Sequence, residues 1–409
     1  MSAKPLIAYF AHHLEDPAYR RRVAMLEAGG ADVVVLVGFA RERPALEALG
    51  NVPVHVLGYT KAANFMARIR SVLAATLRIR SWATRIKTAD IILARNLECL
   101  ALAVLGAWWN RLAAPIHYEV LDIHRLMLRQ DIVGQGIRKV EHLLMRRCAT
   151  VVVSSPAFVT EYFDRFQPSH PPVVLIENKV FPSQTYRPQS RQATLSPKLR
   201  IGWFGNIRCR KSLRMLKALA ESMTDRVVID IRGTVASTDI PDFDELIGDI
   251  DNVHFHGRYT YPDDLSRIYG EVDIAWAIDF FEEGQNSMWL LPNRLYESCL
   301  FGCIPMALKG TETARWMQGH GLGMILPQFT LETLTRLLGQ MTPANLAESK
   351  NALAENDSAL FECTKAECRA LIERLCTRPD KIPQAQHNTS ITTHSPDNRS
   401  IMIDKEKHS

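Results

Sequence analysis

Acidic residues are absent from one long stretch of this chain. No aspartate or glutamate occurs between Glu47 and Asp90. The formal net charge of all 409 residues is only +5, so the basic character of this stretch is local. Near an anionic membrane each cation contributes about 1 kcal/mol of attraction, which favours peripheral membrane contact over an ordinary solvated surface. A nucleic-acid partner is not expected, because no recognised binding module is present. The cations of the stretch are Lys61, Arg68, Arg70, Arg78, Arg80, Arg85 and Lys87.

Cysteine pairs and long apolar runs are also missing. The eight cysteines form no CxxC pair, so we expect reduced thiols rather than metal ligands, and a cytoplasmic compartment. No window of about 20 residues is apolar enough to span a bilayer. The first residues reach a charged turn after a very short apolar run, unlike a secretory signal. We therefore expect a soluble or peripheral protein without a metal ion or cofactor.

Short apolar runs alternate with helical patterns in both halves of the chain. Runs without strict alternation, separated by helices, are typical of buried parallel strands. A helix is expected over 16–30, where the pattern ends at paired glycines. The polar, proline-bearing segment 182–199 predicts a linker. Expected strands are 5–10, 32–38, 90–94, 115–120, 150–155 and 173–178, then 199–205, 226–233, 252–257, 272–278, 303–308 and 323–327.

This rhythm predicts an α/β protein with two Rossmann-like, doubly wound domains that face a cleft. The N-terminal domain is expected over 1–181 and the C-terminal domain over 200–350, followed by C-terminal helices over 351–376. Residues 377–409 are polar and lack aromatics, which predicts a disordered tail. Because ligands of doubly wound folds bind outside the carboxyl ends of the strands, the cleft is the expected site.

A basic loop at the start of the second domain predicts an anion site. In "WFGNIRCRKSL" (203–213), Gly205 follows a strand and lets the backbone approach a ligand closely. The helix start that follows offers free N–H groups and a positive dipole end. Arg208, Arg210 and Lys211 add charge that suits a phosphate or diphosphate. A solvated basic helix start is the alternative, and the GxGxxG pattern of dinucleotide sites is absent.

A second segment, "PNRLYESCLFGCIP" (292–305), places one carboxylate in an otherwise apolar turn of helix. A buried unpaired charge costs several kcal/mol, so Glu297 requires either a partner or a ligand. A pair with Arg294, three residues earlier on the same side, is the simplest explanation.

Together these two segments resemble the nucleotide-sugar-binding domain of GT-B glycosyltransferases, most closely the family 4-like group. In that family a lysine six positions after the loop glycine holds the donor diphosphate, and Gly205 and Lys211 have this spacing. An arginine usually follows the glycine, where this chain has Asn206. The resemblance therefore implies that Arg208 or Arg210 supplies the missing charge. No divalent metal is required if these cations serve.

The resemblance also implies roles for residues of the second segment. Glu297 matches the helix glutamate that accepts hydrogen bonds from the ribose hydroxyls, and a carboxylate suits two adjacent hydroxyls. Asn293 and Arg294 occupy the stretch where related enzymes contact the phosphates. The family expects a further glutamate at 289, but this chain has Trp289. The way in which the sugar itself is held is therefore not given by the family pattern.

A candidate general base lies in the first domain, in "IHYEVLDIHRL" (116–126). The loop after this strand faces the reacting centre in GT-B enzymes, which implies that Asp122 takes the proton of the acceptor hydroxyl. Glu119 and His124 are further candidates. Asp122 as the N-cap of the following helix is the structural alternative.

The whole-chain pattern, including "AYFAHHLEDPAYRRRV", is similar to glycosyltransferases of succinoglycan-type bacterial exopolysaccharide assembly. This similarity implies transfer of a hexose, expected to be glucose, from a nucleoside diphosphate sugar, expected to be a UDP-sugar. The implied acceptor is a polyprenyl-diphosphate-linked saccharide at the inner face of the cell membrane. Two alternatives stay open: a nucleotide-sugar epimerase of the same fold, and a non-catalytic, membrane-associated assembly protein.

Overall fold

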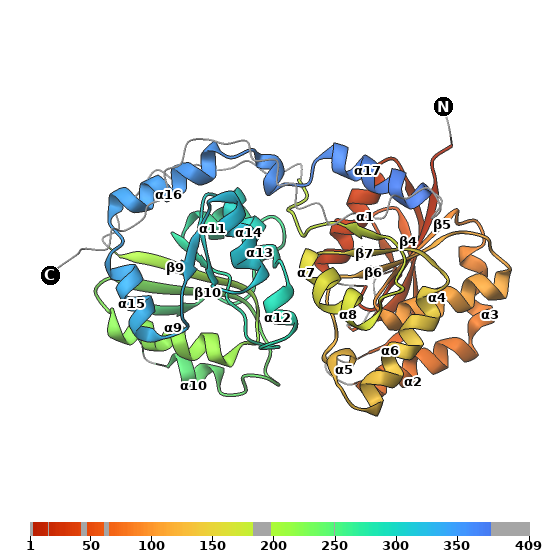
Figure 1. The fold of residues 1–409 in the computed structure, drawn as a ribbon, viewed down its shortest axis with the longest axis horizontal. Helices are drawn as coiled ribbons and strands as arrows, with labels where there is room; N and C mark the ends of the chain where they lie inside the picture. The colour runs from red at the N-terminus through yellow and green to blue at the C-terminus, as the bar shows by residue number, and fades with distance from the viewer. Residues whose placement is uncertain are drawn as a thin grey trace.

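Two parallel sheets, each covered by helices, form two domains that lie next to each other (Figure 1). The computed structural model describes residues 3–14, 16–41, 47–60, 65–182, 198–248 and 250–377. Most of the predicted linker and nearly all of the predicted tail lie outside these residues. The observed architecture confirms the expected fold class of two Rossmann-like domains.

The N-terminal sheet has eight strands in the order β3-β4-β2-β1-β5-β6-β7-β8. Every neighbouring pair is parallel except β3 with β4. The strands are β1 (Leu6–Ala11), β2 (Asp32–Ala40), β3 (Ala48–Leu49), β4 (Val52–Tyr59), β5 (Ile91–Arg95), β6 (Ile116–Val120), β7 (Cys148–Val153) and β8 (Val173–Leu175).

Helices cover both faces of this sheet. One face packs against α1 and against α17, which returns from the end of the chain (Figure 1). The other face packs against α2, α4 and α6. The helices are α1 (Pro17–Ala28), α2 (Phe65–Leu77), α3 (Ile79–Trp82), α4 (Leu97–Asn110), α5 (Arg125–Leu128), α6 (Ile132–Met145), α7 (Pro156–Phe158), α8 (Asp164–Phe166) and α17 (Lys365–Cys376), with single turns at Ala83–Ile86 and Val159–Phe163.

The C-terminal sheet has six parallel strands in the order β11-β10-β9-β12-β13-β14. They are β9 (Leu199–Ile207), β10 (Val227–Val235), β11 (Val253–Phe255), β12 (Ile274–Trp276), β13 (Ile304–Leu308) and β14 (Met324–Leu326). The helices are α9 (Arg210–Ser222), α10 (Phe243–Ile247), α11 (Leu265–Gly270), α12 (Asn286–Trp289), α13 (Asn293–Leu300), α14 (Glu312–His320), α15 (Leu331–Gly339) and α16 (Pro343–Glu355), with a turn at Ser358–Leu360.

The acid-free stretch 48–89 contributes to the core as well as to the surface, and its contact with a membrane stays a prediction. Part of it forms the β3–β4 hairpin, whose strand β4 lies inside the sheet beside β2. Ile79 and Trp82 are buried in the core between this sheet and its helices, so they are not available to a membrane. Arg78 donates to the carbonyl of Leu57 at 2.8 Å, which fixes α2 against β4. Among the described residues, no helix combines the length and apolarity needed to cross a bilayer.

Candidate functional site

A cavity of about 680 Å³ lies between the two domains, within the range of about 300–1,000 Å³ that is typical of small-molecule sites. In the N-terminal domain its wall is the loop from β1 to α1. In the C-terminal domain it is the ends of β9 and β10, the segment 258–261 and the start of α13. The cavity brings together five predicted donor-site residues: Gly205, Asn206, Asn293, Arg294 and Glu297.

Glu297 lies on the cavity wall and is only 4% exposed. The hydroxyl of Tyr269 donates to its Oε2 atom at 2.8 Å. Burial raises the pKa of Glu297, while the Tyr269 hydrogen bond and the charges of Arg21 and Arg294 partly oppose this increase. The carboxylate of Glu297 accepts one hydrogen bond from Tyr269 and has acceptor capacity left on both oxygens. It can therefore accept hydrogen bonds from a pair of ligand hydroxyls.

Arginines give this end of the cavity its positive charge. Four line the wall: Arg21, Arg41, Arg258 and Arg294. The guanidinium of Arg294 donates to the carbonyl of Trp276 at 3.2 Å, which holds it at the start of α13. The simple surface pair of Arg294 with Glu297 does not describe the structure, because both residues line the cavity. Guanidinium groups suit phosphate oxygens, which they can bind in a bidentate geometry.

Arg21 connects the two domains beside the cavity. From α1 it donates to Asn293 Oδ1 of the C-terminal domain at 3.1 Å and to Asn178 Oδ1 at 2.9 Å. Asn178 in turn donates to the carbonyl of Leu291 at 3.0 Å. No role was assigned from the sequence to Arg21, although it lies in the quoted segment "AYFAHHLEDPAYRRRV", or to Arg258, which belongs to no such segment. Their role follows from which segments the fold brings together.

Two glycines face each other at the floor of the cavity. Gly205 on β9 pairs in register with Gly233 on β10, and both have positive φ, 109° and 138°. A Cβ atom on Gly205 would meet nothing within 4 Å, whereas one on Gly233 would lie 1.8 Å from the Gly205 carbonyl oxygen. The absence of side chains at both positions keeps the backbone open to a ligand.

These two glycines provide a matched prediction. Gly205→Ala adds only backbone strain, about 1–3 kcal/mol. Gly233→Ala adds strain and a backbone clash, so it is expected to lower the urea midpoint of the C-terminal domain clearly more than Gly205→Ala does. Equal midpoints for the two variants, measured by urea unfolding, would contradict the register described here.

The remaining predicted cations of the loop lie differently. Arg210 makes a two-pronged ion pair with Asp242, one of its bonds at 2.7 Å, and so faces α10. Lys211 pairs with Glu283 Oε1 at 2.5 Å, and its Nζ atom lies 4.3 Å from the centre of the Phe280 ring. Arg208 lies 4.2 Å above the Phe281 ring. Of the described residues, these three are not part of the cavity wall, so their roles in donor binding stay predictions.

Asp122 also lies outside the cavity wall, in a contact between the domains. Its Oδ1 accepts a hydrogen bond from Asn286 Nδ2 of the C-terminal domain. Glu282, in the same C-terminal loop, has its pKa raised to about 7, first by burial and then by the negative charge of Asp122. The N-cap of α5 is His124, which accepts from the Leu126 amide, so the alternative interpretation of Asp122 as the N-cap is wrong. Its assignment as general base stays a prediction.

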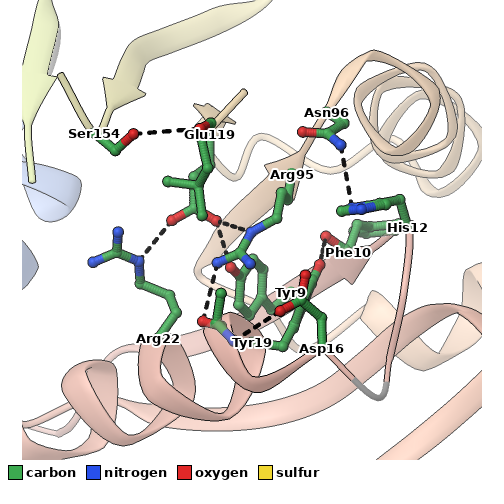
Figure 2. Close-up of polar contacts among 12 residues, drawn as sticks. Tyr9, Phe10, His12, Asp16, Tyr19, Arg22, Arg95, Asn96, Glu119 and Ser154 are labelled. Atoms are coloured by element: carbon green, nitrogen blue, oxygen red, sulfur yellow. Dashed lines mark hydrogen bonds and ion pairs between the residues drawn. The ribbon is translucent and has the colours of Figure 1, made fainter. Parts of the chain in front are cut away.

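Glu119 is structural rather than exposed to the cleft. It is fully buried, and its two oxygens accept from Arg22 Nε at 2.6 Å and Arg95 Nε at 2.7 Å, and from the Tyr9 hydroxyl (Figure 2). Burial alone would raise its pKa, but Arg95 and Arg22 hold the pKa at about 2. The expectation that Glu119 is a reserve base is therefore wrong, because its carboxylate is buried and both of its oxygens already accept from fixed donors.

The buried ion-pair network around Glu119 supports the β1–α1 loop, to whose residues no role was assigned from the sequence. This loop contributes His12, His13 and Asp16 to the cavity wall. Asp16 caps α1 by accepting from the Ala18 amide at 2.9 Å. His12 Nδ1 lies 3.2 Å from Asn96 Nδ2 (Figure 2). Their place directly after a predicted strand, at the carboxyl edge of the sheet, was the available signal.

Trp289 occupies the position where the family pattern expects a glutamate, and here it joins the domains. Its side chain packs against the core of the N-terminal domain, and its carbonyl accepts from the Ser155 hydroxyl. The position has therefore taken an apolar packing role that a carboxylate could not fill.

Comparison with known proteins identifies the family of the chain. No family model matches it. It is 41% identical over 383 residues to the succinoglycan biosynthesis protein ExoL of Rhizobium meliloti, covering 92% of this chain and 95% of that protein.

Solved structures show the fold. Sucrose-phosphate synthase from Thermosynechococcus elongatus aligns with a TM-score of 0.66 at 12% identity, covering 90% of this chain and 98% of that one. Anabaena HepE, in complex with UDP and glucose, aligns with a TM-score of 0.63 at 13% identity, with the same coverage. The resemblance to GT-B glycosyltransferases of succinoglycan-type exopolysaccharide assembly is thus confirmed. The chain belongs to the family of the succinoglycan biosynthesis protein ExoL, and its two domains form the GT-B fold of glycosyltransferases.

Proposed function

We propose that this protein transfers a hexose from a UDP-sugar to a lipid-linked saccharide during exopolysaccharide biosynthesis. The observation that carries the proposal is the interdomain cavity, where a buried carboxylate, Glu297, lies among four arginines and beside the open glycine floor. Groups that recognise anions and a group that recognises hydroxyls therefore line one cavity of the size of a small molecule. A nucleoside diphosphate carries the matching groups, a ribose diol and two phosphates.

The donor end of the reaction follows from these contacts. Glu297 binds the ribose hydroxyls, and Arg294 with Arg258 offsets the charge that develops on the leaving diphosphate. The Asn206 backbone and the Gly205 floor allow the phosphates to approach the end of β9. The solved complexes of Anabaena HepE with UDP and with UDP-glucose support a UDP-sugar as the donor class.

At the acceptor end a base must take one proton from the attacking hydroxyl. Asp122 is the sequence-based candidate, and it faces the C-terminal domain through Asn286. The role of the Rhizobium meliloti relative in succinoglycan biosynthesis supports a saccharide acceptor of an exopolysaccharide pathway. We propose a polyprenyl-diphosphate-linked acceptor, and with such a lipid the reaction would take place at the inner face of the cell membrane.

A transfer assay tests this proposal. Purified protein is incubated with radiolabelled UDP-glucose and with lipid-linked saccharides extracted from exopolysaccharide-producing cells, and label is counted in the organic phase. We expect organic-phase label only when protein, donor and acceptor are all present. Asp122→Asn is expected to lower the rate by about 100-fold or more, since general bases contribute about 10²–10⁴-fold. Full activity of Asp122→Asn would refute its assignment as the base.

The same assay separates the alternatives. Conversion of the donor sugar without any acceptor would identify an epimerase. Absence of both transfer and nucleotide binding would identify a non-catalytic assembly protein of the same fold.

A further inference from the structure

The outward face of α6 is apolar where a surface helix is normally polar. Ile132 is 87% exposed and Leu143 61%, and Val133 and Val140 are half exposed. With about 100° between successive residues, these four side chains fall on one side of the helix, with Gly136 between them. Four large apolar side chains on one solvent-facing stripe are unexpected in a protein that has no partner for them.

The inward face of α6 carries a buried carboxylate. Glu141 is buried and accepts from the Tyr118 hydroxyl at 3.0 Å, the Tyr162 hydroxyl at 2.5 Å and Gln167 Nε2 at 2.8 Å. These bonds fix the rotation of the helix about its axis. The apolar stripe therefore points outward because of a specific buried contact.

The exposed apolar surface continues onto the neighbouring helices. α4 contacts α6 on one side and α2 on the other, and the three helices lie on the same face of the sheet (Figure 1). At its C-terminal end α4 exposes Trp108, which is 69% exposed, and Trp109. Leu77 ends α2 at the same edge, because each of these helices runs back from the carboxyl edge of the sheet to its other edge. We call the outer face of α6 with the C-terminal end of α4 the α4/α6 surface.

Cations flank this surface, and they outnumber the exposed acids beside it. Lys139, Arg146 and Arg147 are exposed along α6. The guanidinium of Arg80 lies 5.9 Å from the Trp109 ring. No acidic residue occurs between 99 and 118, and Glu141 of α6 is buried. The exposed Asp131, which caps α6, is paired with Arg129. The surface is therefore both apolar and positively charged.

We propose that the α4/α6 surface docks on an anionic lipid bilayer. Apolar side chains enter the boundary of the acyl chains, tryptophans favour the interface region, and the cations meet anionic headgroups. A second copy of this chain fits less well, because a two-fold interface would bring the same cations face to face. A nucleic acid would use the cations but would leave the apolar stripe uncovered.

Docking in this way also orients the cleft, a consequence that rests on the proposed function. α6 begins shortly after the loop that holds Asp122, with α5 between them. Its N-terminal end, with Ile132 and Val133, therefore lies at the cleft edge of the sheet. A protein resting on the outer face of α6 holds that edge at the membrane, where a lipid-linked acceptor would enter.

Vesicle co-sedimentation of the full chain tests the docking surface. The vesicles contain either phosphatidylcholine alone or phosphatidylcholine mixed with phosphatidylglycerol. The test variant is Ile132→Asp with Leu143→Asp. The control variant, Leu175→Asp with Phe255→Asp, changes the same number of exposed apolar residues to acids on strands elsewhere. A third variant, Lys139→Gln with Arg146→Gln and Arg147→Gln, leaves the apolar stripe intact.

We expect the wild-type protein and the control variant to sediment with the anionic vesicles and not with the neutral vesicles. Both α6 variants are expected to bind at least about tenfold more weakly. One loses apolar area that enters the bilayer, and the other loses the attraction of its cations to the anionic headgroups. UDP binding in solution should be unchanged in all of them, so failure of docking is separate from failure of the proposed donor site. Equal binding of wild type and both α6 variants would overturn the proposal. So would α6-dependent dimerisation, or nucleic-acid binding, without vesicle binding.

Discussion

Glu119→Gln is expected to lower the stability of the N-terminal domain by about 3–5 kcal/mol, because breaking a buried ion pair leaves uncompensated charge. Arg22 and Arg95 would both lose the carboxylate that their Nε atoms contact at 2.6 and 2.7 Å. The Arg95 guanidinium also lies 4.3 Å from the Tyr19 ring, so its displacement would disturb the start of α1. Urea unfolding of the full chain measures the effect on the N-terminal transition.

A matched control is available on the surface of the same domain. Lys4 and Asp32 form an ion pair at 3.1 Å, with both side chains more than half exposed. Asp32→Asn is expected to change stability by about 1 kcal/mol at most, since exposed pairs contribute little. If Glu119→Gln and Asp32→Asn shifted the transition equally, the buried network would not hold the domain together.

The stability contribution of Glu119 depends on pH in a defined direction. Its pKa in the folded protein is about 2, below the ordinary value of 4.5. A group with a lowered folded pKa stabilises the protein fully above its unfolded pKa. The contribution is therefore present above pH 4.5 and is lost progressively as the pH falls from 4.5 towards 2. Glu119→Gln should lack this acid-dependent loss, which a urea series at several pH values would show.

Glu297→Gln is expected to weaken binding of UDP-glucose by about 30- to 100-fold, equivalent to about 2–3 kcal/mol. A carboxylate accepts hydrogen bonds from two adjacent hydroxyls, whereas an amide offers one acceptor and one donor. Glutamine keeps the shape of the buried side chain and can still accept from Tyr269, so folding should be retained. Calorimetric titration of the variant gives the dissociation constant.

Glu271→Gln is a matched control for this prediction. Glu271 pairs with Arg232 and Arg267 in the same domain and is not among the described residues of the cavity wall. The control variant should therefore bind UDP-glucose as the wild-type protein does. Because the pKa of Glu297 is raised by burial, donor binding should weaken on acidification at a higher pH than an ordinary glutamate would give. Equal affinities of Glu297→Gln and wild type would exclude Glu297 as the ribose ligand.

Much of the fold could be predicted from the sequence, because buried parallel strands are continuous apolar runs. The strand β4 was missed for a physical reason. It lies within a stretch whose most visible property is its lack of acids, and only two of its residues, Val52 and Leu57, are buried, so it does not form one apolar run. Spacing alone also did not show that Ile79 and Trp82 face the core, because apolar and basic residues are interleaved along this stretch.

The candidate site was predictable where a motif is local in sequence. Gly205 and Glu297 each belong to a short segment with its own pattern, and the fold places both on one cavity. Lys211 and Arg210 follow the pattern too, but their partners Glu283 and Asp242 are distant in sequence, so no local spacing could reveal these pairs. Arg21 could not be found either, because its contacts cross from α1 to the other domain.

The central claim is that the interdomain cavity is a nucleoside diphosphate site. Calorimetric titration of the wild-type chain with UDP, UDP-glucose and uridine tests it most directly. We predict that UDP and UDP-glucose bind, and that uridine, which has no phosphates to meet Arg258 and Arg294, binds far more weakly. Failure of UDP to bind, or uridine binding as tightly as UDP, would contradict the account.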